Sequence, residues 1–356
     1  MTSLVPDDLI KVKLMIRSGT PDDHSSALRG FPGHRPVWGG CEFIFDHEAR
    51  DYDWLVAYDD LPPYRGERRS FRDELLACPP ENTLLITVEP SSIKAYGNRF
   101  LRQFGHVLTS QEPWAINQPG TIRSQPALLW FYGAHAKPDD PRGDYDYQVA
   151  HPPLHKTADI STVCSSKQMR HTLHYHRYQF VQKLAAVMPG LEVFGHGVRP
   201  LADKADALDQ FRYHVAIENH VAPHHWTEKL ADSFIGATLP FYYGCPNVTD
   251  YFPEDSVVPI DIFKFDEARE TIEKAIRDRW YEKRLPAILE ARRRVLENYG
   301  LFATIDKIVR EHHRPHSSRE LTTPVHLQSR HKIRQASSVN KLLDLCEKIR
   351  FRLKNR

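Results

Sequence analysis

The residues best suited to chemistry in this sequence surround one predicted helix start. Thr227 stands where an N-cap belongs, directly before Glu228 and Lys229. Leu230 and Phe234 give the helix that follows an apolar face. The first turn of a helix offers free backbone N–H groups and the positive end of the helix dipole, which together bind phosphate. Lys229 adds a positive charge, and Glu228 can accept hydrogen bonds from ribose or sugar hydroxyls. The pattern predicts a site for a phosphate or pyrophosphate, although an ordinary capped helix could carry the same residues.

A buried strand is predicted just before this helix. The run Tyr213 to Ile217 ends in the polar pair Glu218-Asn219, and a loop rich in His and Pro leads to the helix. Ligands of open α/β sheets bind at the carboxyl ends of the strands. We therefore expect Asn219, at the end of the strand, and His225, in the loop, to lie beside the helix start.

The complete string is more specific than any of its parts. FRYHVAIEN is followed by WTEKLADSFIGATLPFYYGCPNVTDYFPEDSVVPID, so the stretch runs from Phe211 to Asp261. It closely resembles the C-terminal signature of glycosyltransferase family 10, the α1,3/4-fucosyltransferases. The resemblance extends from about Ile160 to Tyr299 and is weaker in the N-terminal half. It implies a bacterial-type inverting transferase that uses GDP-fucose, with two Rossmann-like domains facing across a cleft, the arrangement called GT-B.

The resemblance also assigns expected roles to residues of the donor site. Asn219 matches the asparagine of the family's F-E-N, and Glu228 and Lys229 match its V-T-E-K. Arg177, on the helix after the first strand of the second half, matches an arginine near the donor pyrophosphate. His225 stands where tyrosine is common in the family, so the contact to sugar or base is expected to differ there.

A catalytic base is expected in the N-terminal half. An inverting transfer needs a group that takes the proton of the acceptor hydroxyl. The predicted strand Thr83 to Val88 runs directly into Glu89, and the resemblance places a glutamate at such a strand end. Partial desolvation there would raise the pKa of Glu89. A glutamate that only caps the strand before Pro90 is the alternative. With Arg177 and Lys229 on the diphosphate, no metal is required in principle.

The elements that must position these residues alternate between strand-like and helical runs. This alternation is typical of α/β architecture, and 356 residues suit two domains. The segment Lys137 to Pro153 is rich in Asp, Pro and Gly, which places the predicted boundary there. We expect an acceptor-side domain over 1–150, a donor domain over 151–310 and a basic helical tail over 311–356. Phe71 to Ala77 is expected to form a short helix.

The charge of the chain is unevenly distributed. The net charge is +2, but residues 311–356 contain 11 Lys or Arg and 4 Asp or Glu. Residues 340–354 predict a basic amphipathic helix, with Leu342, Leu345, Ile349 and Phe351 or Leu353 on one face. Such a helix either packs on the body or lies on anionic lipid.

Cellular location is predicted from three further observations. The N-terminus has no apolar signal region, no stretch approaches a membrane span, and the five cysteines are scattered without a CxxC pair. These features favour a cytoplasmic protein, in contact with the inner face of the plasma membrane if the tail helix binds lipid. The acceptor would then be a lipopolysaccharide or another surface-glycan precursor. No nucleic-acid partner is expected.

Other functions remain open at this point. Histidines cluster at His171, His174 and His176 and again at His224 and His225, which makes a metallohydrolase the rival enzyme class. No HExxH motif is present, so no metal site is expected. The same fold could also use another nucleotide sugar, or bind carbohydrate or nucleotide without catalysis. Slow hydrolysis of the donor would separate the enzyme from a silent binding protein.

Overall fold

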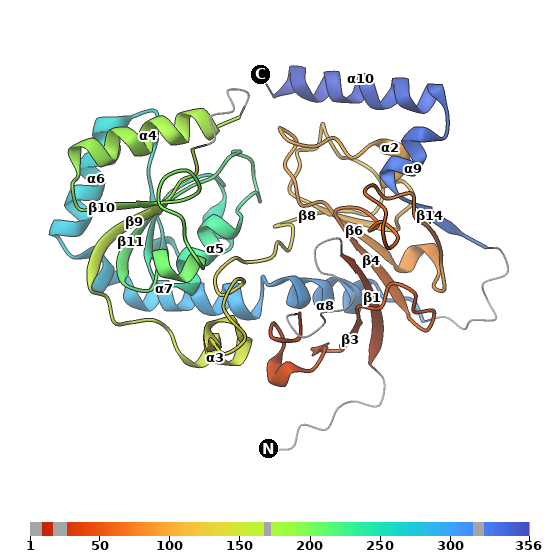
Figure 1. The fold of residues 1–356 in the computed structure, drawn as a ribbon, viewed down its shortest axis with the longest axis horizontal. Coiled ribbons are helices and arrows are strands. Elements are labelled where there is room, and N and C mark those ends of the chain that lie inside the picture. Colours follow the sequence, from red (N-terminus) through yellow and green to blue (C-terminus); the bar gives the residue numbers. More distant parts are fainter. Residues whose placement is uncertain (1–8, 17–26, 167–171, 316–323, 356) are drawn as a thin grey trace. The chain divides into compact units, whose positions relative to one another are not determined.

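The chain forms two compact units in the computed structural model, which describes residues 9–16, 27–166, 172–315 and 324–355. One unit comprises Met1–Ala127 and Leu301–Arg356, and the other comprises Leu128–Gly300. Each unit contains a mainly parallel sheet covered by helices (Figure 1), so the predicted α/β class is confirmed. Within the described residues, no helix combines the length and apolarity needed to cross a membrane.

The limits of the units differ from the predicted boundaries at 150 and 310. The chain enters the second unit at residue 128, because Trp130 and Tyr132 already pack in that unit's core. It returns at residue 301, because the helix α8, Leu301–His312, belongs to the core of the first unit. Residues 311–356 are part of the first unit and do not form a separate tail.

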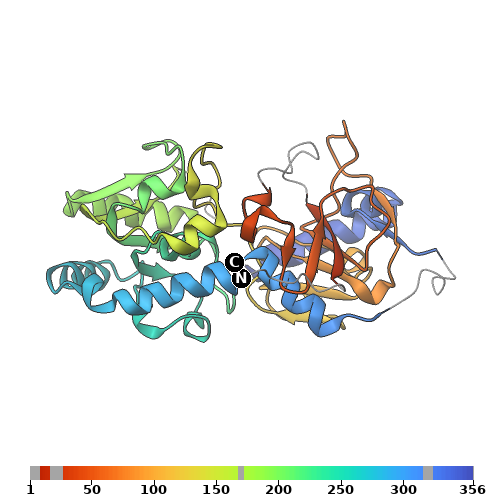
Figure 2. The ribbon, with the colours of Figure 1, turned by 90° about the horizontal axis from the view of Figure 1, so that it is seen from below.

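The first unit is built on a seven-stranded sheet in which only the β2–β3 pair is antiparallel. One face is covered by α8, which lies beside β1 and β3 in Figures 1 and 2 and packs Ile305 against Val12 and Leu14. Parallel strands covered on both faces are apolar throughout. In spatial order the strands are β2 Val37–Trp38, β3 Cys41–Ile44, β1 Ile10–Ile16, β4 Trp54–Tyr58, β6 Thr83–Ile86, β7 His106–Thr109 and β8 Thr121–Arg123.

The last described segment of the chain covers the other face of this sheet. Leu327 is fully buried and Phe351 almost so, in one cluster with Met15 and Leu55. Phe351 also packs edge-on against Trp114. The predicted helix over 340–354 is present as α10 and begins slightly earlier. The helices of this unit besides α8 are α2 Asn98–Leu101, α9 Arg330–Gln335 and α10 Ser338–Lys354.

The helix predicted over Phe71 to Ala77 is wrong. Asp73–Leu75 forms the strand β5, which pairs antiparallel with β14, His326–Gln328. The strand alternates its side chains between two environments, since Glu74 is buried whereas Leu75 is exposed. Its partner lies some 250 residues away in the sequence, so local sequence patterns could not reveal the pairing.

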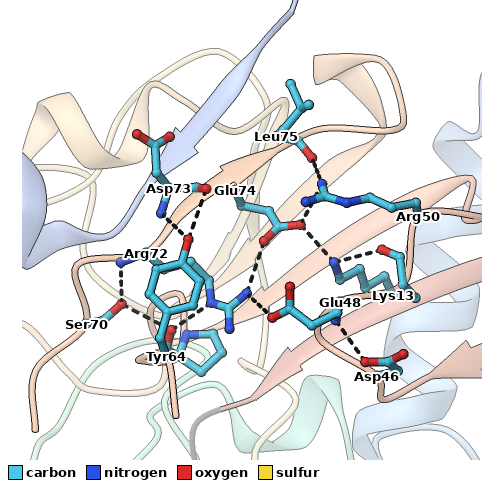
Figure 3. A network of polar contacts seen from close by, with 12 residues as sticks. Lys13, Asp46, Glu48, Arg50, Tyr64, Ser70, Arg72, Asp73, Glu74 and Leu75 are labelled. Atoms are coloured by element: carbon cyan, nitrogen blue, oxygen red, sulfur yellow. Dashed lines mark hydrogen bonds and ion pairs between the residues drawn. The ribbon is translucent and has the colours of Figure 1, made fainter. Parts of the chain in front are cut away.

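A buried charge network attaches β5 to the main sheet (Figure 3). Glu74 accepts from Lys13 Nζ of β1 at 2.8 Å and from Arg72 Nη1 at 3.2 Å, and all three side chains are at most 3% exposed. Burial lowers the pKa of Lys13, and the hydrogen bond and charge of Glu74 oppose this effect. Arg72 also pairs with Glu48, whose side chain is 68% exposed.

The second unit contains five parallel strands. Tyr213, Val215 and Ile217 point to the face covered by α4 and α6, and Ala216 points to the face covered by α5 and α7 (Figure 1). In spatial order the strands are β10 Leu191–Phe194, β9 Ala158–Val163, β11 Phe211–Ile217, β12 Leu239–Tyr243 and β13 Val258–Pro259. The helices are α3 Tyr145–Ala150, α4 His174–Val187, α5 Glu228–Ile235, α6 Phe265–Arg277 and α7 Trp280–Glu297.

The network in Figure 3 generates the first prediction. Glu74→Ala leaves the charges of Lys13 and Arg72 buried without their shared partner, so we expect the free energy of unfolding to fall by about 3–5 kcal/mol. Glu48→Ala removes an exposed partner of the same arginine and should cost at most about 1 kcal/mol. Urea unfolding of the full chain measures both. Equal losses in the two variants would contradict a structural role for the buried network.

Candidate functional site

The strand order of the second unit defines where a ligand can bind. The chain passes from β9 to β10 on one side and then to β11 on the other, so the connections diverge between β9 and β11. In open α/β sheets, ligands bind at the carboxyl ends of the strands at such a switch point. Arg177 lies in α4, which follows β9, and Asn219 directly follows β11. The backbone N–H of Leu173 donates to the carbonyl of Asn219 at 3.4 Å, so the two connections meet.

Glu218 fixes the relation between β11 and α5. The side chain is fully buried and accepts two hydrogen bonds from Thr227, one from the backbone N–H at 2.8 Å and one from Oγ1 at 2.7 Å. The Glu218 backbone N–H donates to Tyr243 of β12 at 2.8 Å. Burial raises the pKa of Glu218, while Lys229 and Thr227 oppose the increase. Glu218 is therefore a positioning residue, which the sequence marked as polar but did not assign to the site.

The first turn of α5 carries the predicted pair of opposite charges. Thr227 is the N-cap and accepts from the Lys229 N–H at 3.3 Å. Lys229 Nζ lies 2.8 Å from Glu228 Oε1 and 3.6 Å from Glu218 Oε2. Burial would raise the pKa of Glu228, but Lys229 lowers it to about 2. Burial also lowers the pKa of Lys229, but the carboxylates of Glu228 and Glu218 outweigh it and the pKa is raised. Both side chains are therefore charged at neutral pH.

Arg177 is buried without a compensating charge. Its side chain is buried, Nε makes no hydrogen bond, and no carboxylate lies within 4.0 Å among the residues that the structure describes. The thiol of Cys164 interacts with the guanidinium, but burial raises the pKa of that thiol, so it is neutral. A buried cation without an anionic partner costs several kcal/mol. At the switch point, such a cation is suited to an anionic ligand.

Lys204 and Asp232 extend the charged cluster. Asp232 Oδ1 accepts from the backbone N–H groups of Phe131 and Tyr132, at 2.9 and 3.0 Å, and Oδ2 lies 4.0 Å from Lys204 Nζ. Burial raises the pKa of Asp232 to about 7. Burial lowers the pKa of Lys204, and the charges of Lys229 and Arg177 lower it further. Three cationic side chains thus lie close enough to influence one another.

Sequence reasoning missed Asp232 and Lys204 for different reasons. Asp232 lies in the same motif, four positions after Glu228 and on the same side of the helix, so helical periodicity could have identified it. Lys204 belongs to a short 3-10 helix, Lys204–Ala207, which has no motif of its own. Only the folded chain brings it to the site.

The remaining predicted residues of this unit line the same connection. The side-chain oxygen of Asn219 is buried and makes no hydrogen bond to a described residue. His225 is buried and packs its ring against His220 at 5.4 Å. Gly244 ends β12 against the site, since an added Cβ would lie 2.4 Å from Glu218 Cγ. In the described part of the chain, no group of three or more His, Cys, Asp or Glu could hold a metal ion.

Glu89 lies in the other unit, three residues beyond the end of β6. Its side chain is exposed, so the desolvation expected from the sequence is not provided. The hydroxyl of Tyr96 accepts from the backbone N–H groups of Val88 and Glu89 and donates to Asp59 Oδ1 at 2.6 Å. Asp59 follows β4 with a left-handed φ of 72°. The sequence did not identify Asp59, although Asp is one of the non-glycine residues enriched in this conformation.

A family model matches residues of the second unit. Residues 154–278 match the family model described as glycosyltransferase family 10 (fucosyltransferase) C-term. All of the matched residues lie in the second unit, which we call the family 10 unit after this match. The matched residues include β9, β11 and the whole of α5, so they contain the complete switch point of the family 10 unit.

Individual relatives cover this chain to different extents. A stretch of 67 residues is 36% identical to the alpha-(1,3)-fucosyltransferase FucT of Helicobacter pylori and spans 18% of this chain and 14% of that protein. A crystal structure of an alpha1,3-fucosyltransferase aligns with 80% of this chain and 82% of its own, at 16% identity and a TM-score of 0.47. A crystal structure of an alpha1,3-fucosyltransferase with GDP-fucose aligns with 82% of this chain and 92% of its own, at 16% identity and a TM-score of 0.45.

The contact between β11 and α5 in the family 10 unit generates a prediction. Thr227→Val removes the N-cap and leaves one oxygen of the buried Glu218 without its hydrogen bond, so we expect a loss of about 1–3 kcal/mol in unfolding free energy. Thr271→Val is the matched control, because Thr271 only donates to a carbonyl within its own helix. The Thr271→Val substitution should change the free energy of unfolding by no more than about 0.5 kcal/mol. Urea unfolding with indole fluorescence measures both variants, and an unchanged Thr227→Val protein would rule out the anchoring role.

Proposed function

We propose that the chain is an inverting glycosyltransferase of the α1,3-fucosyltransferase type, which transfers fucose from GDP-fucose to a hydroxyl of a glycan acceptor. The observation that carries the proposal is the buried guanidinium of Arg177 at the switch point of the family 10 unit, which has no carboxylate partner among the described residues. A sugar diphosphate supplies the negative charge that this site lacks. The name of the Helicobacter pylori relative and the GDP-fucose complex of the structural neighbour support the choice of donor.

The proposed donor site assigns one task to each group. The diphosphate lies against Arg177 and the N-terminus of α5. Lys229 Nζ donates to Thr227 and Glu228, and an ammonium has three N–H groups, so one remains for a phosphate oxygen. Asn219, with its unpaired oxygen, and Glu228 accept from hydroxyl groups of the ribose or sugar. His225 lies in the same loop and borders the sugar or base.

The proposed reaction is a single displacement. Glu89 takes the proton of the acceptor hydroxyl, and the oxygen attacks the anomeric carbon as its bond to the diphosphate breaks. Arg177 and Lys229 stabilise the negative charge that develops on the departing nucleotide. Attack from the side opposite the nucleotide inverts the configuration at the anomeric carbon.

We further propose a lipopolysaccharide or related surface-glycan precursor as acceptor, met at the inner face of the plasma membrane. The support comes from α10, which combines both roles considered for it. Phe351 is buried against the unit, whereas Leu342, Leu345 and Leu353 are 60%, 53% and 64% exposed. A basic helix with an exposed apolar stripe suits an anionic lipid surface.

Nucleotide binding tests the donor site. Arg177→Gln should lower the affinity for GDP and GDP-fucose about 10- to 100-fold, because a charge-assisted hydrogen bond to phosphate contributes about 1.5–3 kcal/mol. Arg293→Gln removes a surface arginine of α7 that pairs with Glu290, and it should leave affinity unchanged. Titration calorimetry measures both, with UDP-sugars in parallel. Equal affinity of Arg177→Gln and the unaltered chain would refute the proposed diphosphate contact.

Transfer kinetics test the base. Glu89→Gln should lower kcat about 10²- to 10⁴-fold and leave the affinity for GDP nearly unchanged, since general base catalysis contributes a factor of this size. Glu81→Gln is the matched control, because Glu81 is also exposed but precedes β6 at the opposite end. Transfer of labelled fucose to lipopolysaccharide acceptors is measured alongside hydrolysis of the donor. A Glu89→Gln protein that loses GDP binding would show a structural role instead.

A further inference from the structure

The first unit contains a cavity that the proposed transfer reaction does not use. It has a volume of about 420 Å³ and lies between α2, α9 and α10, which are neighbours in Figure 1. Small-molecule sites in proteins occupy about 300–1,000 Å³. We call it the α10 cavity. Its walls come from 96–102, 330–334 and 340–350.

Arginines dominate the charge of the α10 cavity. Only Arg334 has a carboxylate within 4.0 Å among the described residues, Asp344 at 3.7 Å. Arg330 donates to a backbone carbonyl, that of Ala95, at 2.5 Å. No hydrogen bond or ion pair joins the side chain of Arg102 to another described residue, and this side chain is exposed. The arginines of the wall are Arg99, Arg102, Arg330, Arg334 and Arg350.

The acidic residues of the wall do not balance these charges. Asp344 is already shared between Arg334 and Lys348, whose Nζ lies 2.6 Å away. Burial raises the pKa of Glu347, although Arg350 opposes the increase. Five arginines therefore face two carboxylates, and the surplus positive charge favours an anion.

Part of the rest of the wall is apolar. Phe100, Ile333 and Leu343 contribute to it, and Leu343 lies on α10 near the exposed leucines of that helix. A second, smaller cavity of about 150 Å³ shares Arg330 and Arg334 with the α10 cavity, and its wall is mainly polar. Guanidinium groups bind phosphate through paired hydrogen bonds. A ligand with a phosphate at one end and an apolar chain at the other matches both the arginines and the apolar residues of the α10 cavity.

We propose that the α10 cavity binds the phosphate end of an anionic lipid, with the acyl chains against the apolar side of α10. The site would hold a defined lipid molecule, which differs from general attraction of the basic helix to a charged surface. The inference is independent of the donor site, because every residue of the cavity belongs to the first unit.

Cys346 provides a built-in probe of occupancy. It lines the cavity and is exposed, whereas the other four cysteines are buried. The full chain is labelled with a neutral maleimide in the presence of dioctanoyl phosphatidate below its micelle concentration. At a lipid concentration ten times Kd we expect labelling to slow about tenfold, since only the free site reacts. Dioctanoyl phosphatidylcholine, inorganic phosphate and an acidic oligosaccharide are compared at the same concentration and should protect little.

Paired variants separate the cavity from the charge of the helix. R102E/R350E reverses the charge at two exposed positions of the wall and should abolish the protection of Cys346 by phosphatidate. K341E/R352E makes the same change in charge at exposed positions of α10 outside the wall, and it should keep the protection. Each rate is divided by that of the same variant without lipid, so altered thiol reactivity cancels.

Several results would overturn the proposal. Equal protection by phosphate would indicate a simple anion site, equal protection by phosphatidylcholine an apolar groove, and protection by the oligosaccharide alone an acceptor site. Loss of protection in both variants would indicate nonspecific attraction. Absence of protection in the unaltered chain would exclude the lipid even if R102E/R350E does not fold. GDP affinity, measured on the same samples, reports separately on the donor site.

Discussion

The hydrogen bonds between Glu218 and Thr227 are the constraint on which the donor side of the structure depends. They join the end of β11 to the start of α5, and this junction sets where the helix N-terminus and Lys229 point. Gly244 must lack a side chain because the carboxylate occupies the space beside it. A buried acid with both oxygens bound to one residue holds that residue in a single position.

Buried cations have carboxylate partners in the first unit, whereas Arg177 of the second unit has none among the described residues. Lys13 and Arg72 share Glu74 within the protein, and Arg72 also pairs with Glu48, so each cation has a carboxylate partner and the network holds β5 on the sheet (Figure 3). Arg177 is equally inaccessible, but no described carboxylate balances it. The first arrangement is complete within the described residues, whereas the proposed function assigns the missing negative charge of the second to a ligand. A buried ion therefore indicates function only after its partners have been identified.

Much of the family 10 unit could be predicted from the sequence because its elements are local. The strand predicted from Tyr213 to Ile217 lies within β11 and has its predicted end, and α5 begins directly after the predicted N-cap Thr227, since an apolar run and an N-cap mark them. Elements that depend on distant partners could not be predicted. β5 has few apolar residues and exists because β14 pairs with it, and Lys204 reaches the site only through the fold. The role of Glu89 stays a prediction.

The discontinuity of the first unit imposes an order on biogenesis. Residues 128–300 form one continuous segment, so the family 10 unit has its whole core available once that segment has left the ribosome. The first unit has to wait, because Leu327 and Phe351 from the last described segment belong to its hydrophobic cluster. Until they arrive, the cluster on one face of its sheet is incomplete, and apolar surface there is open to aggregation or chaperones. Of the two units, the one whose translation starts earlier is thus the later to complete its fold.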